Sequence, residues 1–311
     1  MESVSPTVSK QLHYSLISKD NAVNIWIAGA RPRTLPAAIA PVLIGTSLIK
    51  SDGIAINWVS AALALAVGLL LQIAVNYSND YSDGIRGTDE VRVGPIRLVA
   101  SGLATASQVK RAAILSYSSA AICGLILAIR TSPFLILVGA IAIIAGWKYT
   151  GGKNPYGYRG FGEISVFIFF GLVATMGSYF AQSQRLTWQS LLLAIPMGAL
   201  SCTILGLNNL RDRPKDELVG KKTLAVRLGD GRARLALITL LIIALTASLA
   251  VVAITPWALL VLLTLPLQFI LIKGISQGTS GSGLIPLLGK AGELQLLTSL
   301  LITLALLLTK A

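Results

Sequence analysis

Two stretches of the chain combine carboxylate and amide side chains at helical spacing. In the first, Asn76, Asp80 and Asp83 lie four and three residues apart, and Asn79 lies four residues before Asp83. Since a helix places residues three and four apart on one face, we expect these groups to converge. Carboxylate and amide oxygens are the hard ligands that Mg²⁺ prefers, and Mg²⁺ completes its octahedron with water and phosphate oxygens.

The second stretch has the same composition. Asn208, Asp212 and Asp216 follow one another at intervals of four residues, with Asn209 alongside. Because Pro214 disrupts a helix interior, we expect Asp216 on the loop just after the helix. One such cluster alone is equally explained as a solvated helix end. Two matching clusters favour a pair of metal sites.

Basic side chains that suit phosphate oxygens accompany both stretches. Arginine grips phosphate bidentately, and lysine acts as a point charge. Taken singly, each of these cations is equally explained as a charge that sets membrane topology or faces lipid head groups. The flanking residues are Arg92, Arg97, Lys221, Lys222 and Arg227, while Tyr149 and Lys153 offer a hydroxyl and an ammonium from another loop.

The composition narrows the class of protein that carries these motifs. Of the 311 residues, 54% are hydrophobic and 13% charged, and the mean hydropathy is +0.74, which excludes a water-soluble globular domain. The single histidine, His13, lies in the polar N-terminal tail. A histidine-based zinc site or a Ser-His-Asp triad in the body of the chain is therefore excluded.

Nine apolar segments approach the roughly 20 residues that a membrane-spanning helix needs. We therefore predict an all-α polytopic membrane protein, with residues 1–21 as an N-terminal tail and residues 22–311 as a single nine-helix domain around a central cavity. The first segment contains prolines and arginines, so we expect it to begin at the interface before it turns into the membrane. The segments lie near 23–49, 55–78, 107–129, 132–149, 162–183, 188–208, 234–254, 256–273 and 290–309.

The charges are unevenly divided between the two sides of these segments. All but four of the 26 basic residues fall on the side of the N-terminus; the exceptions are Lys50, Arg130, Arg185 and Lys310. The positive-inside rule makes that side cytoplasmic and places the C-terminus opposite. All acidic residues except Asp52 share the same side, which topology alone does not require, so we expect the site and the cavity mouth there.

Metal sites above an apolar, membrane-embedded cavity suit a substrate with a diphosphate head and a hydrocarbon tail, such as a polyprenyl diphosphate. In that chemistry the metals withdraw charge from the leaving group, and the cavity shields an allylic cation until an electron-rich acceptor attacks it. No covalent nucleophile is needed. A cation-coupled transporter is the rival from another class, although its acidic residues should lie near the membrane midplane.

The chain resembles the UbiA superfamily of intramembrane prenyltransferases, nine-helix bundles with an Asn-Asp-x-x-Asp motif and an Asp-x-x-x-Asp motif. Residues 79–83 and 212–216 fit these motifs. The wider family often has a further Asp where this chain has Gly87, followed by Thr88-Asp89, as in the branch that prenylates 1,4-dihydroxy-2-naphthoate. Similarity to that branch extends over residues 31–36, 79–89, 92–102, 149–152, 158–163 and 220–229.

The resemblance implies Mg²⁺-dependent transfer of a polyprenyl group to the ring carbon that bears the carboxylate, with loss of CO₂ and diphosphate, to form demethylmenaquinone. Phytyl transfer in phylloquinone biosynthesis is the nearest alternative. The implied metal ligands and catalytic residues are Asp80, Asp83, Asp212 and Asp216. The implied substrate-binding residues are Arg31, Asn76, Asn79, Arg97, Tyr149, Lys153, Asn208, Asn209, Lys221, Lys222 and Arg227.

Glu163 has two interpretations. It is a candidate to orient the acceptor or take its hydroxyl proton, and it is equally explained as an acid that favours a helix N-terminus. The expected partners are the two substrates and the bilayer of the cell membrane. We expect no nucleic-acid partner, and the sequence favours no particular oligomeric state.

Overall fold

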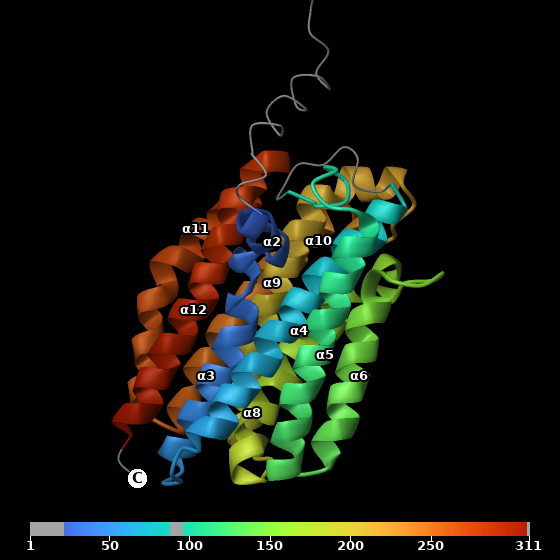
Figure 1. Ribbon diagram of the computed structural model, residues 1–311. Coiled ribbons are helices and arrows are strands. Elements are labelled where there is room, and N and C mark those ends of the chain that lie inside the picture. Colours follow the sequence, from blue (N-terminus) through green and yellow to red (C-terminus); the bar gives the residue numbers. More distant parts are fainter. Residues whose placement is uncertain (1–21, 88–95, 310–311) are drawn as a thin grey trace, which may run out of the picture.

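The computed structural model describes residues 22–87 and 96–309, and within these ranges all regular secondary structure is helical, without strands. Seven helices are long and apolar enough to cross a membrane, a bent pair forms an eighth span, and Phe134–Thr150 is a shorter apolar helix. The helices run side by side as a bundle (Figure 1). These segments account for the nine predicted ones, so the all-α polytopic fold is confirmed.

The helices follow one another in a single bundle. Among them, η4 is a π-helix, and the other η elements are 3₁₀ helices. The elements are α2 (Ala22–Ala30), η2 (Pro32–Thr34), α3 (Pro36–Ser51), α4 (Trp58–Ile85), α5 (Ala106–Arg130), α6 (Phe134–Thr150), η3 (Tyr156–Arg159), α7 (Gly162–Val166), η4 (Phe167–Val173), α8 (Ala174–Ser183), α9 (Trp188–Leu218), α10 (Leu224–Ala250), η5 (Val251–Ala253), η6 (Pro256–Thr264), α11 (Leu265–Ser276), η7 (Gly281–Gly283) and α12 (Leu284–Leu308).

Local sequence signals explain where several of these helices begin. The side chains of Asn57, Thr105 and Thr187 accept hydrogen bonds from the first turns of α4, α5 and α9. Such caps satisfy backbone N–H groups that have no partner inside the helix. The two threonines form capping boxes with the third residue of their helices.

The first span is bent, as the sequence predicts. Arg31 adopts the left-handed conformation (φ 54°, ψ 71°), and prolines open both η2 and α3. Proline suits the first turn of a helix, where its missing N–H costs nothing. The segment Ile25–Thr34 and α3 therefore meet at 52°.

Both acidic stretches lie within helices, because α4 and α9 continue past the apolar segments to Ile85 and Leu218. Pro214 lies inside α9, so the prediction that Asp216 follows the helix was wrong. Proline removes one backbone donor, and packing against neighbouring helices lets a membrane helix continue through it. Asp212 and Asp216 are thus one turn apart on the same helix.

Helix α10 also begins earlier than expected, at Leu224 rather than near residue 234. Gly229, at φ 73° and ψ 172°, interrupts the helical geometry. A left-handed φ of this kind favours glycine, because it lacks a Cβ. A short segment therefore precedes the apolar part of α10. The loop before it places Lys221 beside Asp83 at the end of α4.

Helix α9 is the most buried of the spans and packs against α3, α10, α12 and η4. Where it meets η4, a Cβ added to Gly171 would lie 2.6 Å from the Cα of Gly198. Small residues let membrane helices approach closely, and here two glycines face each other across the contact. This contact fixes the π-helical turn of η4 beside α9.

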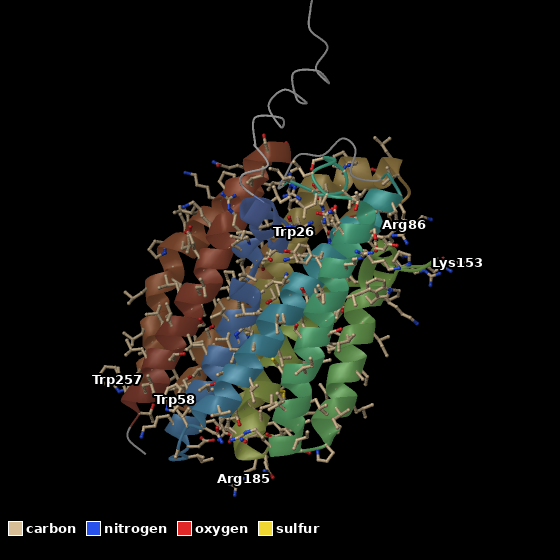
Figure 2. All side chains as sticks on the ribbon, viewed as in Figure 1. Trp26, Trp58, Arg86, Lys153, Arg185 and Trp257 are labelled. Atoms are coloured by element: carbon tan, nitrogen blue, oxygen red, sulfur yellow. The ribbon has the colours of Figure 1, made fainter. Side chains whose placement is uncertain are left out.

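The two ends of the bundle carry different residues, as expected when successive loops alternate between the two sides of the membrane. Arg86 and Lys153 lie at one end, and Arg185 lies at the other (Figure 2). Trp58 and Trp257 also lie at the end that carries Arg185, and both are exposed. Tryptophan is enriched where a membrane meets water, so the two tryptophans indicate that this end lies at a membrane–water interface.

Candidate active site

A cavity of about 350 Å³ lies inside the bundle between α4 and α9. Asp83 and Asp212 line its polar end, and Tyr149 and Leu135, from opposite ends of α6, both contribute to its wall. At 1.5 Å per helical residue, the cavity therefore extends about 20 Å along α6. The space suits a molecule with a charged head and a long apolar tail.

Most of the predicted site residues are brought together at this cavity. They come from five separated parts of the chain: the bend between α2 and α3, the end of α4, the segment before α5, the end of α6, and the end of α9 with the segment after it. Those that line the cavity are Arg31, Asn76, Asn79, Asp83, Arg97, Tyr149, Asn208, Asn209, Asp212, Asp216 and Lys221.

Asp83 is the centre of the cationic cluster at the polar end. Lys221 Nζ lies 3.2 Å from its Oδ1, and Arg97 Nη2 lies 3.5 Å from its Oδ2. The Tyr158 hydroxyl donates a hydrogen bond to Oδ1. All of these cations and the carboxylate are at least nine-tenths buried, so their attraction is poorly screened by water.

Tyr158 is a functional candidate that sequence reasoning missed. Two cations lie over its ring, with Arg86 Cζ 5.3 Å and Lys221 Nζ 4.5 Å from the centroid. The backbone N–H of Lys222 donates to its carbonyl at 2.9 Å, which joins η3 to the segment before α10. Tyr158 belongs to a stretch that supported the family resemblance, but its spacing gave no sign of its contact with Asp83.

The second acidic stretch is also paired. Arg211 Nε and Nη2 donate to the two carboxylate oxygens of Asp212 at 2.7 and 2.8 Å, a bidentate contact. One turn earlier, Asn209 Nδ2 donates to Glu163 Oε1 at 2.8 Å. A carboxylate only accepts, so this bond turns the amide nitrogen of Asn209 toward Glu163 and its oxygen away. Glu163 itself does not line the cavity.

Asp80 differs from the prediction. It is fully buried, does not line the cavity, and accepts hydrogen bonds from the backbone N–H groups of Leu98 at 2.7 Å and Val99 at 3.1 Å. Its carboxylate thus holds the chain that follows Arg97, and its absence from the cavity lining separates it from Asp83 and Asp212. The structure gives Asp80 a structural contact where the sequence predicted a metal ligand.

Three predicted substrate-binding cations also lie outside the cavity. Lys153, Lys222 and Arg227 are exposed, and none lines the cavity wall. Helix α6 ends at Thr150, so the helical spacing from Tyr149 does not carry on to Lys153, which points away from the bundle (Figure 2). Arg227 instead donates to the carbonyl of Lys222 at 3.2 Å.

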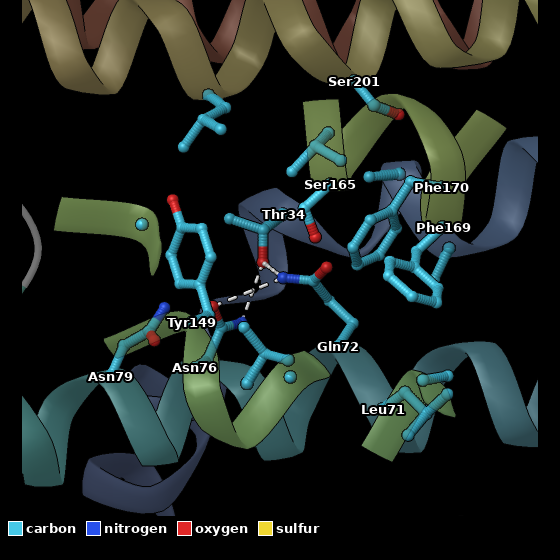
Figure 3. Close-up of a pocket in the computed structure, with 18 of the residues that line it drawn as sticks. Thr34, Leu71, Gln72, Asn76, Asn79, Tyr149, Ser165, Phe169, Phe170 and Ser201 are labelled. Carbon is cyan, nitrogen blue, oxygen red and sulfur yellow. Dashed lines mark hydrogen bonds between the residues drawn. The ribbon is translucent and has the colours of Figure 1, made fainter. Parts of the chain in front are cut away.

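Deeper along the cavity, a network of neutral polar side chains lies on the wall. Gln72, Asn76 and Thr34 are joined by hydrogen bonds, with Phe169 and Phe170 of η4 nearby (Figure 3). Neither Gln72 nor Thr34 was predicted as a site residue. Their uncharged side chains lie inside or beside an apolar run and carry no spacing signal.

On another part of the wall, the Tyr156 hydroxyl donates to the carbonyl of Ala145 at 2.9 Å and lies 2.8 Å from Ser165 Oγ. Burial raises the pKa of Tyr156, and the bond to Ser165 offsets part of that rise. The phenol is therefore neutral at physiological pH and contributes a hydroxyl, not a charge, to the cavity.

The side chains that line the polar end fit Mg²⁺. Within residues 22–87 and 96–309, no three His, Cys, Asp or Glu side chains form a group able to hold a metal by themselves. Mg²⁺ takes only one or two carboxylates and completes its shell with water and substrate phosphates. Asp83 with Asn79 on α4, and Asp212 with Asp216 on α9, supply that kind of donor set on two sides of one space.

Comparison with known proteins identifies the family of the chain. The UbiA prenyltransferase family profile matches residues 38–279, so the chain belongs to the UbiA prenyltransferase family. A Mycobacterium tuberculosis relative named 1,4-dihydroxy-2-naphthoate octaprenyltransferase is 50% identical over 275 residues, covering 88% of this chain and 94% of the relative. The family resemblance inferred from the sequence is thereby confirmed.

Solved structures show the same fold at low sequence identity. A UbiA homologue from Aeropyrum pernix superimposes with a TM-score of 0.70 at 14% identity and covers 87% of this chain and 97% of its own. A homologue from Archaeoglobus fulgidus, bound to GPP and Mg²⁺, gives 0.65 at 17% identity over 91% and 99%.

Proposed function

We propose that this protein transfers a polyprenyl group from polyprenyl diphosphate to 1,4-dihydroxy-2-naphthoate, with loss of CO₂ and diphosphate, as a step of menaquinone biosynthesis. The product is the dihydroxy form, demethylmenaquinol, and a separate oxidation gives demethylmenaquinone. The observation that carries the proposal is one cavity whose polar end combines Asp83, Asp212, Lys221 and Arg97 and whose apolar part extends about 20 Å along α6. The relative from M. tuberculosis supports the choice of acceptor.

The residues at the polar end divide into acids and cations. Asp83 with Asn79, and Asp212 with Asp216, would hold Mg²⁺, which when bound would withdraw charge from the diphosphate leaving group. Lys221 and Arg97 already contact Asp83, so they lie where they can also balance diphosphate oxygens. The negative charge of the diphosphate matches the cations, and the positive charge of Mg²⁺ matches the acids.

The cavity below the polar end serves the cationic stage of the reaction. The C–O bond to diphosphate breaks, and its electron pair leaves with the diphosphate. The electron-rich ring carbon that bears the carboxylate forms the new C–C bond, and loss of CO₂ returns an electron pair to the ring. The apolar walls contributed by α5, α6 and η4 exclude water that would otherwise capture the allylic cation.

The protein acts in a membrane, and the charge distribution supports one orientation. The end of the bundle that carries Arg86 and Lys153 is the cytoplasmic end of the cell membrane under the positive-inside rule, and the C-terminus lies opposite. The cavity mouth then opens toward soluble dihydroxynaphthoate, while the apolar tail is drawn from the bilayer.

Mass spectrometry of the product quinone tests the proposal. Purified protein with Mg²⁺, dihydroxynaphthoate and either a polyprenyl or a phytyl diphosphate is expected to yield a prenylated dihydroxynaphthalene without the carboxylate, which air oxidises to the quinone that is detected. The polyprenyl donor should be preferred. The Asp212→Ala variant is the inactive control. A product that retains the carboxylate, or preferred use of the phytyl donor, would contradict the proposal.

A further inference from the structure

Gln72 is a cavity residue that the proposed chemistry has not yet used. It lies on α4 one turn before Asn76, is 7% exposed, and lines the cavity. Its Nε2 donates to Thr34 Oγ1 at 3.1 Å and to Asn76 Oδ1 at 3.3 Å (Figure 3). Both hydrogens of this amide nitrogen are therefore used within the protein.

The surrounding bonds fix the direction of this amide. Thr34 has a single hydroxyl hydrogen, which it donates to the carbonyl of Arg31 at 2.9 Å, so toward Gln72 and Asn76 it only accepts. Asn76 Nδ2 donates to the carbonyl of Ala30 at 2.8 Å and to Thr34 Oγ1 at 2.9 Å, which leaves Asn76 Oδ1 as the acceptor for Gln72.

A flipped Gln72 amide would turn its oxygen toward two acceptors and forfeit both bonds. The amide nitrogen of Gln72 is thus held against the protein, and Oε1 is its remaining polar atom at the cavity. An amide oxygen accepts hydrogen bonds and does not take up a proton at physiological pH. Phe169 and Phe170 line the same cavity and supply an aromatic wall (Figure 3). The combination suits a flat ring that carries a hydroxyl donor.

We propose that Gln72 Oε1 accepts a hydrogen bond from a ring hydroxyl of the naphthoate acceptor, and that this bond makes Gln72 a specificity-determining residue. This inference rests on the proposed function. The hydroxyl next to the carboxylate is already satisfied by an internal hydrogen bond. The hydroxyl on the far side of the ring is the free donor, so it is the one that Gln72 recognises.

This contact orients the acceptor and selects for the second hydroxyl. An acceptor that lacks this hydroxyl leaves the buried Gln72 carbonyl unpaired, and sites built around a hydrogen bond discriminate strongly against such analogues. We expect 1,4-dihydroxy-2-naphthoate to bind at least about tenfold more tightly than 1-hydroxy-2-naphthoate, on the scale of one lost hydrogen bond.

The test measures how tightly the two naphthoates bind to full-length protein in lipid nanodiscs. Gln72→Met keeps an unbranched side chain of similar size and removes the acceptor, so it should erase the preference and bind both compounds equally. Gln268→Met, which changes a buried glutamine of α11 outside the cavity lining, is the matched control and should behave as wild type.

Binding of polyprenyl diphosphate is measured on the same samples and should be unchanged in Gln72→Met. The inference is overturned if Gln72→Met keeps the preference, if wild type shows none, or if Gln72→Met weakens both naphthoates and the prenyl donor alike. Wild type that binds neither naphthoate would overturn the proposed function itself, and that result is distinct from the others.

Discussion

At the scale of residues, two aspartates within one turn of α4 have different surroundings. Asp83 faces the cavity and is contacted by Lys221, Arg97 and Tyr158. Asp80 faces the backbone of Leu98 and Val99. A helix turns by about 100° per residue, so three residues are enough to give two carboxylates separate partners. We infer separate roles, metal and substrate binding for Asp83 and support of the Arg97 segment for Asp80.

Substituting each aspartate separates these roles. Asp83→Asn is expected to raise the Mg²⁺ concentration needed for half-maximal rate and to lower kcat at least about 100-fold, because a charge at the leaving group is lost. Asp80→Ala removes two charge-assisted backbone hydrogen bonds and is expected to lower the free energy of unfolding by about 3 kcal/mol or more.

Initial rates against Mg²⁺ and thermal unfolding in detergent, measured on the same preparations, check this pair. The Asp80→Ala protein that remains folded should show an unchanged Mg²⁺ requirement. A raised requirement without loss of stability would mean that Asp80 is a metal ligand, as the sequence first indicated.

At the scale of elements, the cavity depends on how closely Gly162–Ser183 packs on α9. The Gly171–Gly198 contact leaves no room for a Cβ, and the π-helical turn η4 at this point contributes Phe169 and Phe170 to the cavity wall. π-Helical turns inside membrane or soluble helices often mark functional sites. The same contact therefore supports both packing and the shape of the site.

A single methyl group tests this packing. Gly171→Ala is expected to lower the free energy of unfolding by about 1–3 kcal/mol, because the added Cβ meets backbone that must shift. Gly289→Ala in α12 is the matched control, since a Cβ there meets nothing within 4 Å, and it should not destabilise the protein. Equal melting temperatures for the two variants would contradict this account of the contact.

At the scale of the whole molecule, hydropathy and charge predicted the fold well. The bilayer requires long apolar runs, so the nine segments could be identified directly from the sequence. The loops between them could then be assigned to alternating sides. The acidic motifs were also visible, because carboxylates in apolar helices are costly and stand out. Asp83, Asp212 and Asp216 meet at one cavity as predicted.

The rest depended on contacts between distant segments. Tyr158 and Gln72 became visible only when η3 and the α2–α3 bend were placed against α4. Lys153, Lys222 and Arg227 are predicted site residues that proved to be exposed. A basic residue close to a motif in the sequence can still point away from the site, because a loop holds it outward. Neither turn geometry nor side-chain direction is set by local spacing alone.

Release of CO₂ and diphosphate by purified protein tests the central claim most directly. With Mg²⁺, a polyprenyl diphosphate and dihydroxynaphthoate labelled in its carboxylate, we expect one CO₂ per diphosphate, no release of either after EDTA is added, and recovery when Mg²⁺ is restored. Turnover that survives chelation, or diphosphate released without CO₂, would contradict metal-dependent prenyl transfer at this cavity.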